Sequence, residues 1–216
     1  MDRFNLDYVE MMLPRFEGVK TVLDVGALDV NGTPREAVTQ RGFEYTGCDV
    51  EKGRGVDVVV DITADFAQVD RAFAGRRFDA VMSLNTLEHI FDPIKALDNM
   101  LALVRPGGYL LVVAPCVWEL HAWPYDFYRL NPDFFTRFAE TRRLEIVEGS
   151  FLMAARDTRR FSPDTQSFPE EVPSGRLPRP SRWLFTALRG ILLPGLKQCW
   201  PRTSVNVTCR TRAKTD

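Results

Sequence analysis

Between residues 20 and 150 the chain alternates short apolar segments with segments of helical periodicity. The first apolar segment, residues 20–25, is rich in β-branched residues and stops at Gly26, as a buried strand does. Strands that alternate with helices build a parallel sheet covered by helices on both faces. The sequence therefore predicts one α/β domain over residues 1–216, a length sufficient for one sizeable core.

Seven strands are expected, and the last of them alternates between polar and apolar residues. The fifth is apolar throughout, as a central parallel strand should be. The expected strands are residues 20–25, 43–50, 56–60, 78–84, 109–114, 144–147 and 204–210. The predicted fold is a seven-stranded, mostly parallel sheet with helices on both faces and a late antiparallel strand.

Helix boundaries are marked by capping residues. Thr33 is a natural N-cap, Glu36 completes a capping box, and Gly42 is a stop signal. The clearest helix opens at residues 92–93, and a shorter one opens at residues 131–132.

The second and third expected strands are separated only by residues 51–55. A parallel crossover ordinarily needs a dozen or more residues. Either this connection is a bare extended loop, or the third strand lies elsewhere.

Composition is that of an ordinary soluble protein, with 45% hydrophobic and 26% charged residues. The formal charge of −1 leaves no large basic field, so we expect no nucleic acid as the main partner. Residues 1–10 lack a basic region followed by an apolar run, which predicts a cytoplasmic protein with reduced thiols.

Metal-binding patterns are sparse. None of the four cysteines forms a C-x-x-C pair, and His89 and His121 are the two histidines of the chain. These counts argue against a structural zinc site, and we expect no bound metal.

The tail is unlike the rest of the chain. Residues 151–203 are expected to form an insertion or lid between the last two strands, with an irregular, Pro- and Arg-rich loop at residues 156–181. Residues 183–196 are apolar but contain Arg189, and a bilayer span needs about 20 apolar residues. We expect no membrane span and a helix packed on the domain; an interfacial helix is the alternative.

Acidic residues stand at the ends of the first three expected strands. Asp24 precedes Gly26, Asp49 ends the second strand, and Asp61 ends the third. Ligands of open α/β sheets bind at the carboxyl ends of the strands, where an acid such as Asp49 can accept hydrogen bonds from ribose hydroxyls. Gly26 allows a sharp turn and close approach of a ligand to the backbone.

Four motifs in order resemble class I S-adenosylmethionine-dependent methyltransferases of the small methyltransferase-domain type. They are Val-Leu-Asp-Val-Gly-Ala (22–27), Tyr-Thr-Gly-Cys-Asp (45–49), Phe-Asp-Ala-Val-Met-Ser-Leu followed by Asn-Thr-Leu-Glu-His (78–89), and Pro-Gly-Gly leading into a strand (106–113). The resemblance covers residues 20–150, the expected cofactor-binding core, and implies a Rossmann-like fold.

The resemblance also implies S-adenosyl-L-methionine as the cofactor. The residues expected to bind it are Asp24, Gly26, Ala27, Leu28, Asp49, Val50, Asp61, Ile62 and Asn85. The loop after the first strand would line the methionine moiety, Asp49 would hold the ribose, and Val50, Asp61 and Ile62 would meet the adenine. Asn85 would lie near the sulfonium and the amino group.

The glycine-rich run departs from the usual pattern of the family. Leu28 and Val30 replace its second and third glycines, and the loop continues to Asn31 and Gly32. This form is similar to a Gly-x-x-Asp-x-Asn-Gly variant among small methyltransferases. It argues against an NAD-dependent oxidoreductase, which needs glycines for close approach to a pyrophosphate.

The segment 121–129 carries the candidate substrate-binding side chains Tyr125, Asp126, Tyr128 and Arg129. His121 is the first candidate for a catalytic base and His89 the second. The alternatives are a packed loop whose Asp126–Arg129 pair fixes its shape, and a structural role for His89.

The expected function is methylation of an oxygen or nitrogen atom of a small-molecule acceptor. A non-catalytic S-adenosylmethionine- or nucleotide-binding protein is the alternative. The aromatic residues of the tail serve equally as a lid or as a homodimer contact.

Overall fold

The computed structural model describes residues 3–30, 32–118, 120–121, 125–154, 159–160 and 203–212. Its helices are α1 (Arg3–Met12), α2 (Arg35–Gln40), α3 (Phe66–Ala72), α4 (Pro93–Leu103) and α5 (Pro132–Arg142), with 3₁₀ turns η1 (Leu13–Arg15) and η2 (Leu87–His89). Its strands are β1 (Thr21–Val25), β2 (Glu44–Asp49), β3 (Val58–Val59), β4 (Phe78–Leu84), β5 (Val104–Val117), β6 (Glu145–Ile146), β7 (Leu152–Ala154), β8 (Arg159–Arg160) and β9 (Thr203–Arg210).

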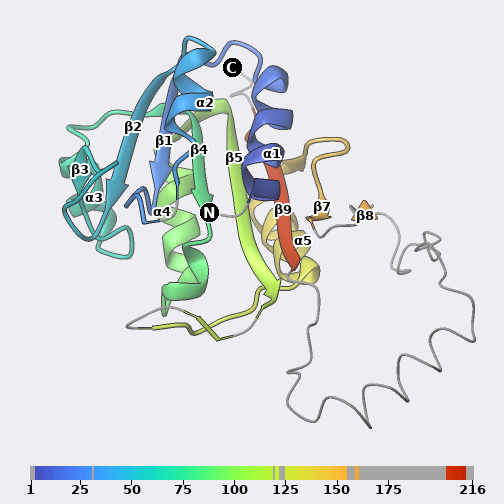
Figure 1. The fold of residues 1–216 in the computed structure, drawn as a ribbon. Helices are drawn as coiled ribbons and strands as arrows, with labels where there is room; N and C mark the ends of the chain where they lie inside the picture. Colours follow the sequence, from blue (N-terminus) through green and yellow to red (C-terminus); the bar gives the residue numbers. More distant parts are fainter. Residues whose placement is uncertain are drawn as a thin grey trace, which may run out of the picture.

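The strands of the described residues form one sheet in the order β3-β2-β1-β4-β5-β9-β7-β8, and β6 also pairs with β9 (Figure 1). The strands from β3 to β5 are parallel to their neighbours, whereas β9 runs antiparallel to β5. The predicted sheet, mostly parallel with a late antiparallel strand, is confirmed. Strand order reverses at β1, because β2 lies on one side of it and β4 on the other.

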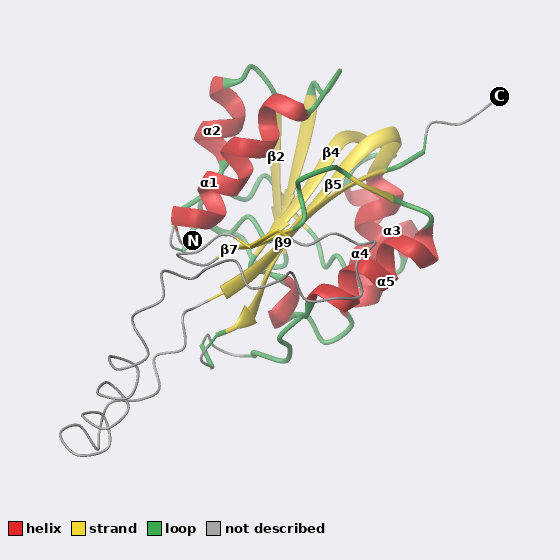
Figure 2. Cartoon of the chain, turned by 90° about the vertical axis from the view of Figure 1, so that its right-hand side faces the viewer, coloured by secondary structure: helices red, strands yellow, loops and turns green. Residues whose placement is uncertain are grey.

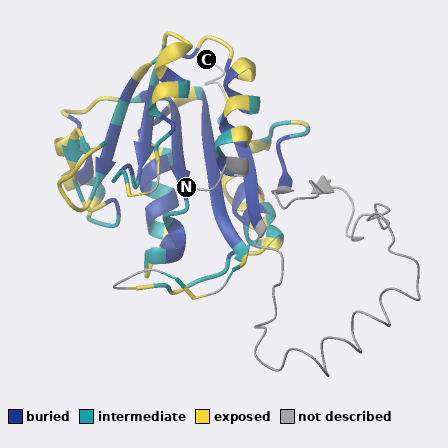
Figure 3. Cartoon of the chain, viewed as in Figure 1, coloured by how far each residue is buried: buried dark blue, intermediate teal, exposed yellow. Residues whose placement is uncertain are grey.

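Helices cover both faces of the sheet, as expected: α1 and α2 lie on one side and α3, α4 and α5 on the other (Figure 2). Alternate side chains of each central strand pack against the two layers, following the period of two in a strand. On β1, Leu23 and Val25 join the core with α3, α4 and α5, whereas Val22 joins the core with α1 and α2. The central strands are therefore buried on both faces (Figure 3).

The Pro106–Gly108 turn lies inside β5 rather than before it. The register of β4 with β5 shifts between Phe78 and Ala80, so the turn forms a bulge. A Cβ on Gly108 would lie 2.5 Å from the carbonyl oxygen of Asp79, which explains the glycine. The strand therefore begins at Val104, five residues earlier than predicted.

Two local predictions are corrected. Helix α2 begins at Arg35, with Pro34 at the N-cap, so the capping box of Thr33 and Glu36 does not form as expected. Thr33 Oγ1 instead accepts a hydrogen bond from the Arg35 backbone N–H at 3.2 Å. Strand β3 is only two residues long, and the connection before it is the bare loop that we gave as one alternative.

The start of the tail adds two short strands, β7 and β8, that the sequence did not predict. Strand β7 pairs with β9 inside the sheet. The predicted helix at residues 183–196 and most of the loop at residues 156–181 lie outside the described residues. Within the part of the chain that is described, no helix has the length and apolar character needed to cross a bilayer.

Candidate active site

The loop after β1 turns at Gly26, which has a φ of +85°. A Cβ at this position would lie 2.0 Å from Oγ1 of Thr86. The backbone N–H groups of Gly26 and Ala27 both donate to the carbonyl oxygen of Cys48, at 2.9 and 3.0 Å. The loop is therefore fixed between the ends of β2 and β4, and only glycine fits the turn.

A pocket lies at the carboxyl ends of β1 and β4. Its lining contains four residues that the sequence predicted, Asp24, Gly26, Ala27 and Leu28. The remaining lining residues are Gly32, Thr33, Pro34 and Leu84. This is the point where strand order reverses, which is where open α/β sheets bind ligands.

Asp24 is 2% exposed, and its Oδ2 accepts a hydrogen bond from the Tyr45 hydroxyl at 2.5 Å. Burial raises the pKa of the Asp24 carboxyl to about 6, and the hydrogen bond from Tyr45 opposes this shift. The Arg35 guanidinium lies over the Tyr45 ring, 4.3 Å from its centre. Tyr45 stands in one of the motifs, but nothing in the sequence assigned it this contact.

Asp49 lies beside the same loop. Its Oδ2 accepts the backbone N–H of Leu28 at 3.1 Å, and its Oδ1 accepts that of Glu51 at 3.1 Å. A carboxylate oxygen has two acceptor sites, so both atoms can accept a further donor. The neighbouring Val50 side chain is 64% exposed and offers an apolar surface.

The loop at residues 26–30 is held by the bare crossover at residues 50–57. Arg54 forms an ion pair with Asp29 at 2.6 Å, and the Asp29 N–H donates to the Arg54 carbonyl at 2.8 Å. A Cβ on Gly53 would lie 2.3 Å from Cδ1 of Leu28. Gly53 in the crossover thus makes room for the bulky residue that replaces the usual second glycine.

Asn85 follows β4 with a φ of +53°, a left-handed conformation that is uncommon for residues other than glycine. Its Oδ1 accepts a hydrogen bond from Nδ2 of Asn5 at 2.7 Å. Asn5 lies in α1 and is fully buried. The sequence predicted Asn85 but gave no signal for Asn5, which is 80 residues away.

Asp61 and Ile62 do not belong to the pocket lining. Asp61 is exposed, and its Oδ1 accepts the N–H of Thr63 at 2.8 Å. Ile62 is 6% exposed and packs in the core, and its carbonyl oxygen accepts Nδ2 of Asn99 at 2.7 Å. Asp61 and Ile62 therefore lie just after β3, and they lie outside the lining of this pocket, as do Asp49, Val50 and Asn85.

A second polar cluster joins η2 to the segment after β5. Nε2 of His89 lies 3.6 Å from Oε1 of Glu88, and Nε2 of His121 lies 3.9 Å from the same oxygen. The two imidazole rings meet edge to face, with centres 5.3 Å apart. The two candidate bases are therefore neighbours, although they are far apart in the sequence.

Burial changes the proton affinities in this cluster. Glu88 is fully buried, and burial raises the pKa of its carboxyl to about 8. Burial lowers the pKa of His89, so its imidazole favours the neutral form. The motif Leu-Glu-His contained Glu88, but its burial and its contacts could not be inferred from the motif.

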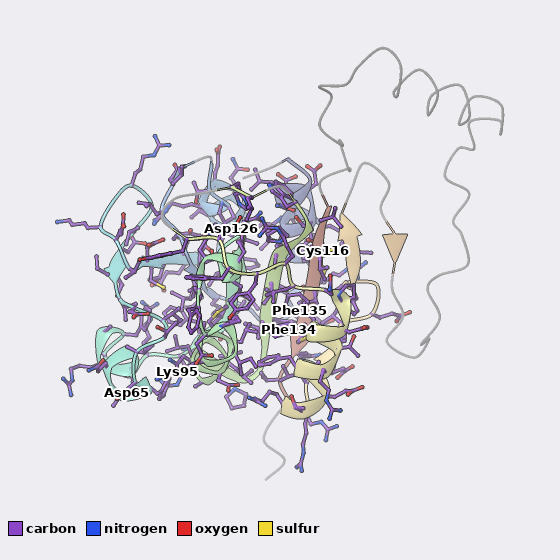
Figure 4. All side chains as sticks on the ribbon, turned by 90° about the horizontal axis from the view of Figure 1, so that it is seen from below. Asp65, Lys95, Cys116, Asp126, Phe134 and Phe135 are labelled. Atoms are coloured by element: carbon purple, nitrogen blue, oxygen red, sulfur yellow. The ribbon has the colours of Figure 1, made fainter. Side chains whose placement is uncertain are left out.

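The Arg129 guanidinium donates two hydrogen bonds to the Asp126 carboxylate. Nη1 donates to Oδ1, and Nη2 donates to Oδ2 at 2.7 Å. The hydrogen bond to Arg129 lowers the pKa of Asp126 to about 2. Figure 4 shows Asp126 in the segment that crosses the ends of the central strands. The pair fixes the shape of that segment.

The two tyrosines of the segment differ in environment. The Tyr128 hydroxyl donates to the Phe91 carbonyl at 2.9 Å, whereas the Tyr125 side chain is 60% exposed. The backbone N–H of Phe127 donates to the Glu88 carbonyl at 2.7 Å, which ties this segment to η2. All four candidate substrate-binding residues therefore lie beside the two histidines.

This open sheet, with its late antiparallel strand and an acid-lined loop after β1, defines a class I S-adenosylmethionine-dependent methyltransferase fold. Residues 1–145 match the family model of the methyltransferase domain. The chain belongs to that family.

Curated relatives with the most similar sequences include two ubiquinone biosynthesis O-methyltransferases. The protein of Alkalilimnicola ehrlichii is 34% identical over 115 residues, which cover 49% of this chain and 45% of the relative. The protein of Pseudomonas paraeruginosa is 37% identical over 106 residues, which cover 43% of each chain. The chain thus spans about half the length of the curated relatives it matches.

Solved structures with the same fold include a S-adenosylmethionine-dependent methyltransferase from Archaeoglobus fulgidus, with a TM-score of 0.56, 15% identity and coverage of 95% and 94%. The 1,6-didemethyltoxoflavin-N1-methyltransferase of Burkholderia thailandensis, solved with bound 1,6-didemethyltoxoflavin and S-adenosylhomocysteine, has a TM-score of 0.56, 15% identity and coverage of 98% and 80%. The cyclase SpnF has a TM-score of 0.58, 18% identity and coverage of 96% and 82%. These likenesses establish the fold.

Proposed function

We propose that this protein is an S-adenosylmethionine-dependent methyltransferase that acts on an oxygen or nitrogen atom of a small molecule. One observation carries the proposal: Asp24 at the end of β1 and the fixed loop residues Gly26, Ala27 and Leu28 line a small hollow at the point where strand order reverses. The family of the chain and the names of its relatives support the same reaction.

The residues at this site fit the proposed cofactor. The buried Asp24 carboxyl and the Gly26 turn offer polar groups to a methionine moiety, and Asp49 retains acceptor sites for ribose hydroxyls. The exposed Val50 side chain offers an apolar face to adenine. In this arrangement Asp61 and Ile62 border the adenine from β3, and Asn85 faces the sulfonium from β4.

When bound, the cofactor supplies an activated methyl group, so the chain's task is to orient the acceptor and to remove its proton. We propose His121 as the base and His89 as the second candidate. Nδ1 of His89 lies 2.8 Å from the Tyr125 carbonyl oxygen, which only accepts, so Nδ1 carries the proton and Nε2 retains its lone pair. Tyr125, Asp126, Tyr128 and Arg129 would contact the acceptor from the same segment.

The proposal extends to the organisation of the molecule. Residues 1–216 would form a single domain, with a cofactor-binding core at residues 20–150 and an insertion at residues 151–203 that covers the acceptor or forms a homodimer contact. Nucleic acid would not be a partner. Cys48 and Cys209 are buried, unbonded thiols, which accords with a cytoplasmic location.

The first test is a calorimetric titration of the protein with S-adenosylhomocysteine, with NAD as the control ligand. We expect micromolar binding of the first and none of the second. Asp49→Ala should lose most of this affinity because it removes the ribose acceptor, whereas Glu10→Ala, an exposed acid on α1, should not.

Absence of S-adenosylhomocysteine binding to the unaltered protein would overturn the proposal. If binding occurs, transfer of a labelled methyl group into molecules of a cell extract separates a methyltransferase from a protein that only binds the cofactor.

A further inference from the structure

Three potential metal-binding atoms converge in the cluster that joins η2 to the segment after β5. Glu88, His89 and His121 each offer one ligand atom, and all three atoms lie within 4.8 Å of one another. The two Nε2 atoms lie 3.6 and 3.9 Å from Oε1 of Glu88. In a tetrahedral zinc site with bonds of about 2.0–2.1 Å, ligand atoms lie about 3.4 Å apart. Small side-chain rotations therefore bring the three atoms to coordination distance.

Both imidazole rings present the same nitrogen to this point. Nδ1 of His89 donates to the Tyr125 carbonyl oxygen at 2.8 Å, so its Nε2 faces Glu88 with a lone pair. Nδ1 of His121 faces Oδ2 of Asp126 at 3.5 Å. Metal-binding histidines characteristically direct their second ring nitrogen to a carbonyl or a carboxylate, which fixes the tautomer and the ring orientation.

Glu88 is the second, independent indication of a ligand. Its side chain is fully buried, yet neither of its carboxylate oxygens has a hydrogen-bond partner among the described residues. Buried polar groups are nearly always hydrogen-bonded, paired or bound to a metal. A cation between Glu88 and the two histidines satisfies this carboxylate.

We propose that Glu88 Oε1, His89 Nε2 and His121 Nε2 bind a divalent transition-metal ion, with Zn²⁺ as the best match. Two imidazoles and one carboxylate suit zinc and its first-row neighbours, whereas Mg²⁺ and Ca²⁺ prefer oxygen ligands alone. Three protein ligands leave a coordination position open, as in catalytic rather than structural zinc sites. Sequence reasoning expected no metal because it counted cysteines and could not bring the two histidines together.

The role of this metal rests on the proposed function. Thr86, two residues before Glu88, donates a hydrogen bond to the Val25 carbonyl oxygen at 3.3 Å, which joins the segment that carries Glu88 and His89 to the start of the cofactor loop. A metal there binds the acceptor through an oxygen, and the hydroxyl proton leaves to water because the cation stabilises the resulting oxyanion. The acceptor is then a hydroxyl compound, and with the metal bound the two histidines serve as its ligands, which replaces the role of base proposed above for the metal-free site.

The test measures metal binding by tag-free, chelator-treated protein. Titration with Co²⁺, followed by visible absorption, and with Zn²⁺, followed by calorimetry, should show one site per chain. Metal binding should weaken by more than about 100-fold in each of the variants Glu88→Gln, His89→Gln and His121→Gln. Loss of a group that only supports a metal ligand already costs up to about 100-fold in affinity, so loss of a ligand should cost more. Glu140→Gln, an exposed acid on α5, should bind as the unaltered protein does.

Circular dichroism and S-adenosylhomocysteine binding verify that each variant is folded. Absence of Co²⁺ and Zn²⁺ binding to the unaltered protein, or undiminished binding by the three variants, would overturn the proposal. A thiolate-to-cobalt charge-transfer band would also overturn it, because the metal would then lie on a cysteine. Metal binding without S-adenosylhomocysteine binding would retain the site and reject the proposed function instead.

Discussion

The Asp24 carboxyl group lies in the lining of the pocket and is almost fully buried. The sequence predicted this residue, Gly26 and Asp49, because an acid or a glycine at a strand end is a local pattern. It could not predict that the Tyr45 hydroxyl donates to Asp24, or that Asn5 donates to Asn85, because these contacts depend on how separate elements pack. At the scale of residues, motifs therefore indicated a candidate site but not the side chains that support its residues.

Asp24 makes stability depend on pH. Its folded pKa of about 6 lies above the ordinary value of about 3.9, so the folded state binds a proton more tightly than the unfolded state. Its contribution to stability is complete below about pH 4 and is lost as the pH rises through 6. The unfolding free energy of the unaltered protein minus that of Asp24→Asn should fall by about 2–3 kcal/mol between pH 4 and pH 7.

Urea denaturation of both proteins across this range measures that difference. Groups common to the two proteins, Glu88 included, cancel in the subtraction. A difference that stays constant with pH would show that Asp24 does not titrate in this window.

The loop at residues 26–30 and the crossover at residues 50–57 act as one element, although the sequence presents them as separate connections. The short spacing left two alternatives, and the bare loop proved correct because β3 needs only two residues to pair with β2. Strands β7 and β8 were not predicted, since these segments of three and two residues carry no alternating or apolar pattern of their own. The longer patterns located β1, β2, β4 and β9 to within one or two residues, whereas β5 extends five residues before and three residues after the predicted segment.

The contact between Gly53 and Leu28 predicts a compensating pair of substitutions. Gly53→Ala places a methyl group against the Leu28 side chain, which must then move toward the pocket that it lines. We expect about tenfold weaker S-adenosylhomocysteine binding, equivalent to about 1.4 kcal/mol. When the Leu28 side chain has already been shortened by Leu28→Ala, adding Gly53→Ala should cause little further loss of affinity.

Calorimetry on the four proteins of this double-mutant cycle measures the coupling. Additive losses of affinity would mean that the two loops do not interlock through these side chains.

In the whole molecule, helix α1 packs against the late strand β9. The Tyr8 hydroxyl of α1 donates to the Ser150 carbonyl oxygen at 2.8 Å and lies 2.9 Å from Thr208 Oγ1 of β9. The sheet class and the two helical layers followed from the alternation of elements along the chain. The association of α1 with β9 did not, because it joins residues 200 positions apart.

Tyr8→Phe should therefore destabilise the fold by about 1–3 kcal/mol, because it leaves a buried carbonyl oxygen unsatisfied. Tyr125→Phe is the matched control and should change the free energy of unfolding little, since the Tyr125 side chain is 60% exposed. Thermal or urea unfolding of the two variants gives the comparison. Equal stabilities would show that the hydroxyl of Tyr8 is not needed to join α1 to β9.

The pairing of β5 with β9 sets a condition on synthesis of this protein at the ribosome. One edge of β5, an almost wholly apolar strand, is completed only by β9, which is translated roughly 90 residues later. At about 5–20 residues per second, the nascent chain displays that edge for several seconds or longer. Unpaired apolar edges recruit other strands, so chaperone supply should limit the yield of this protein more strongly than its final stability does.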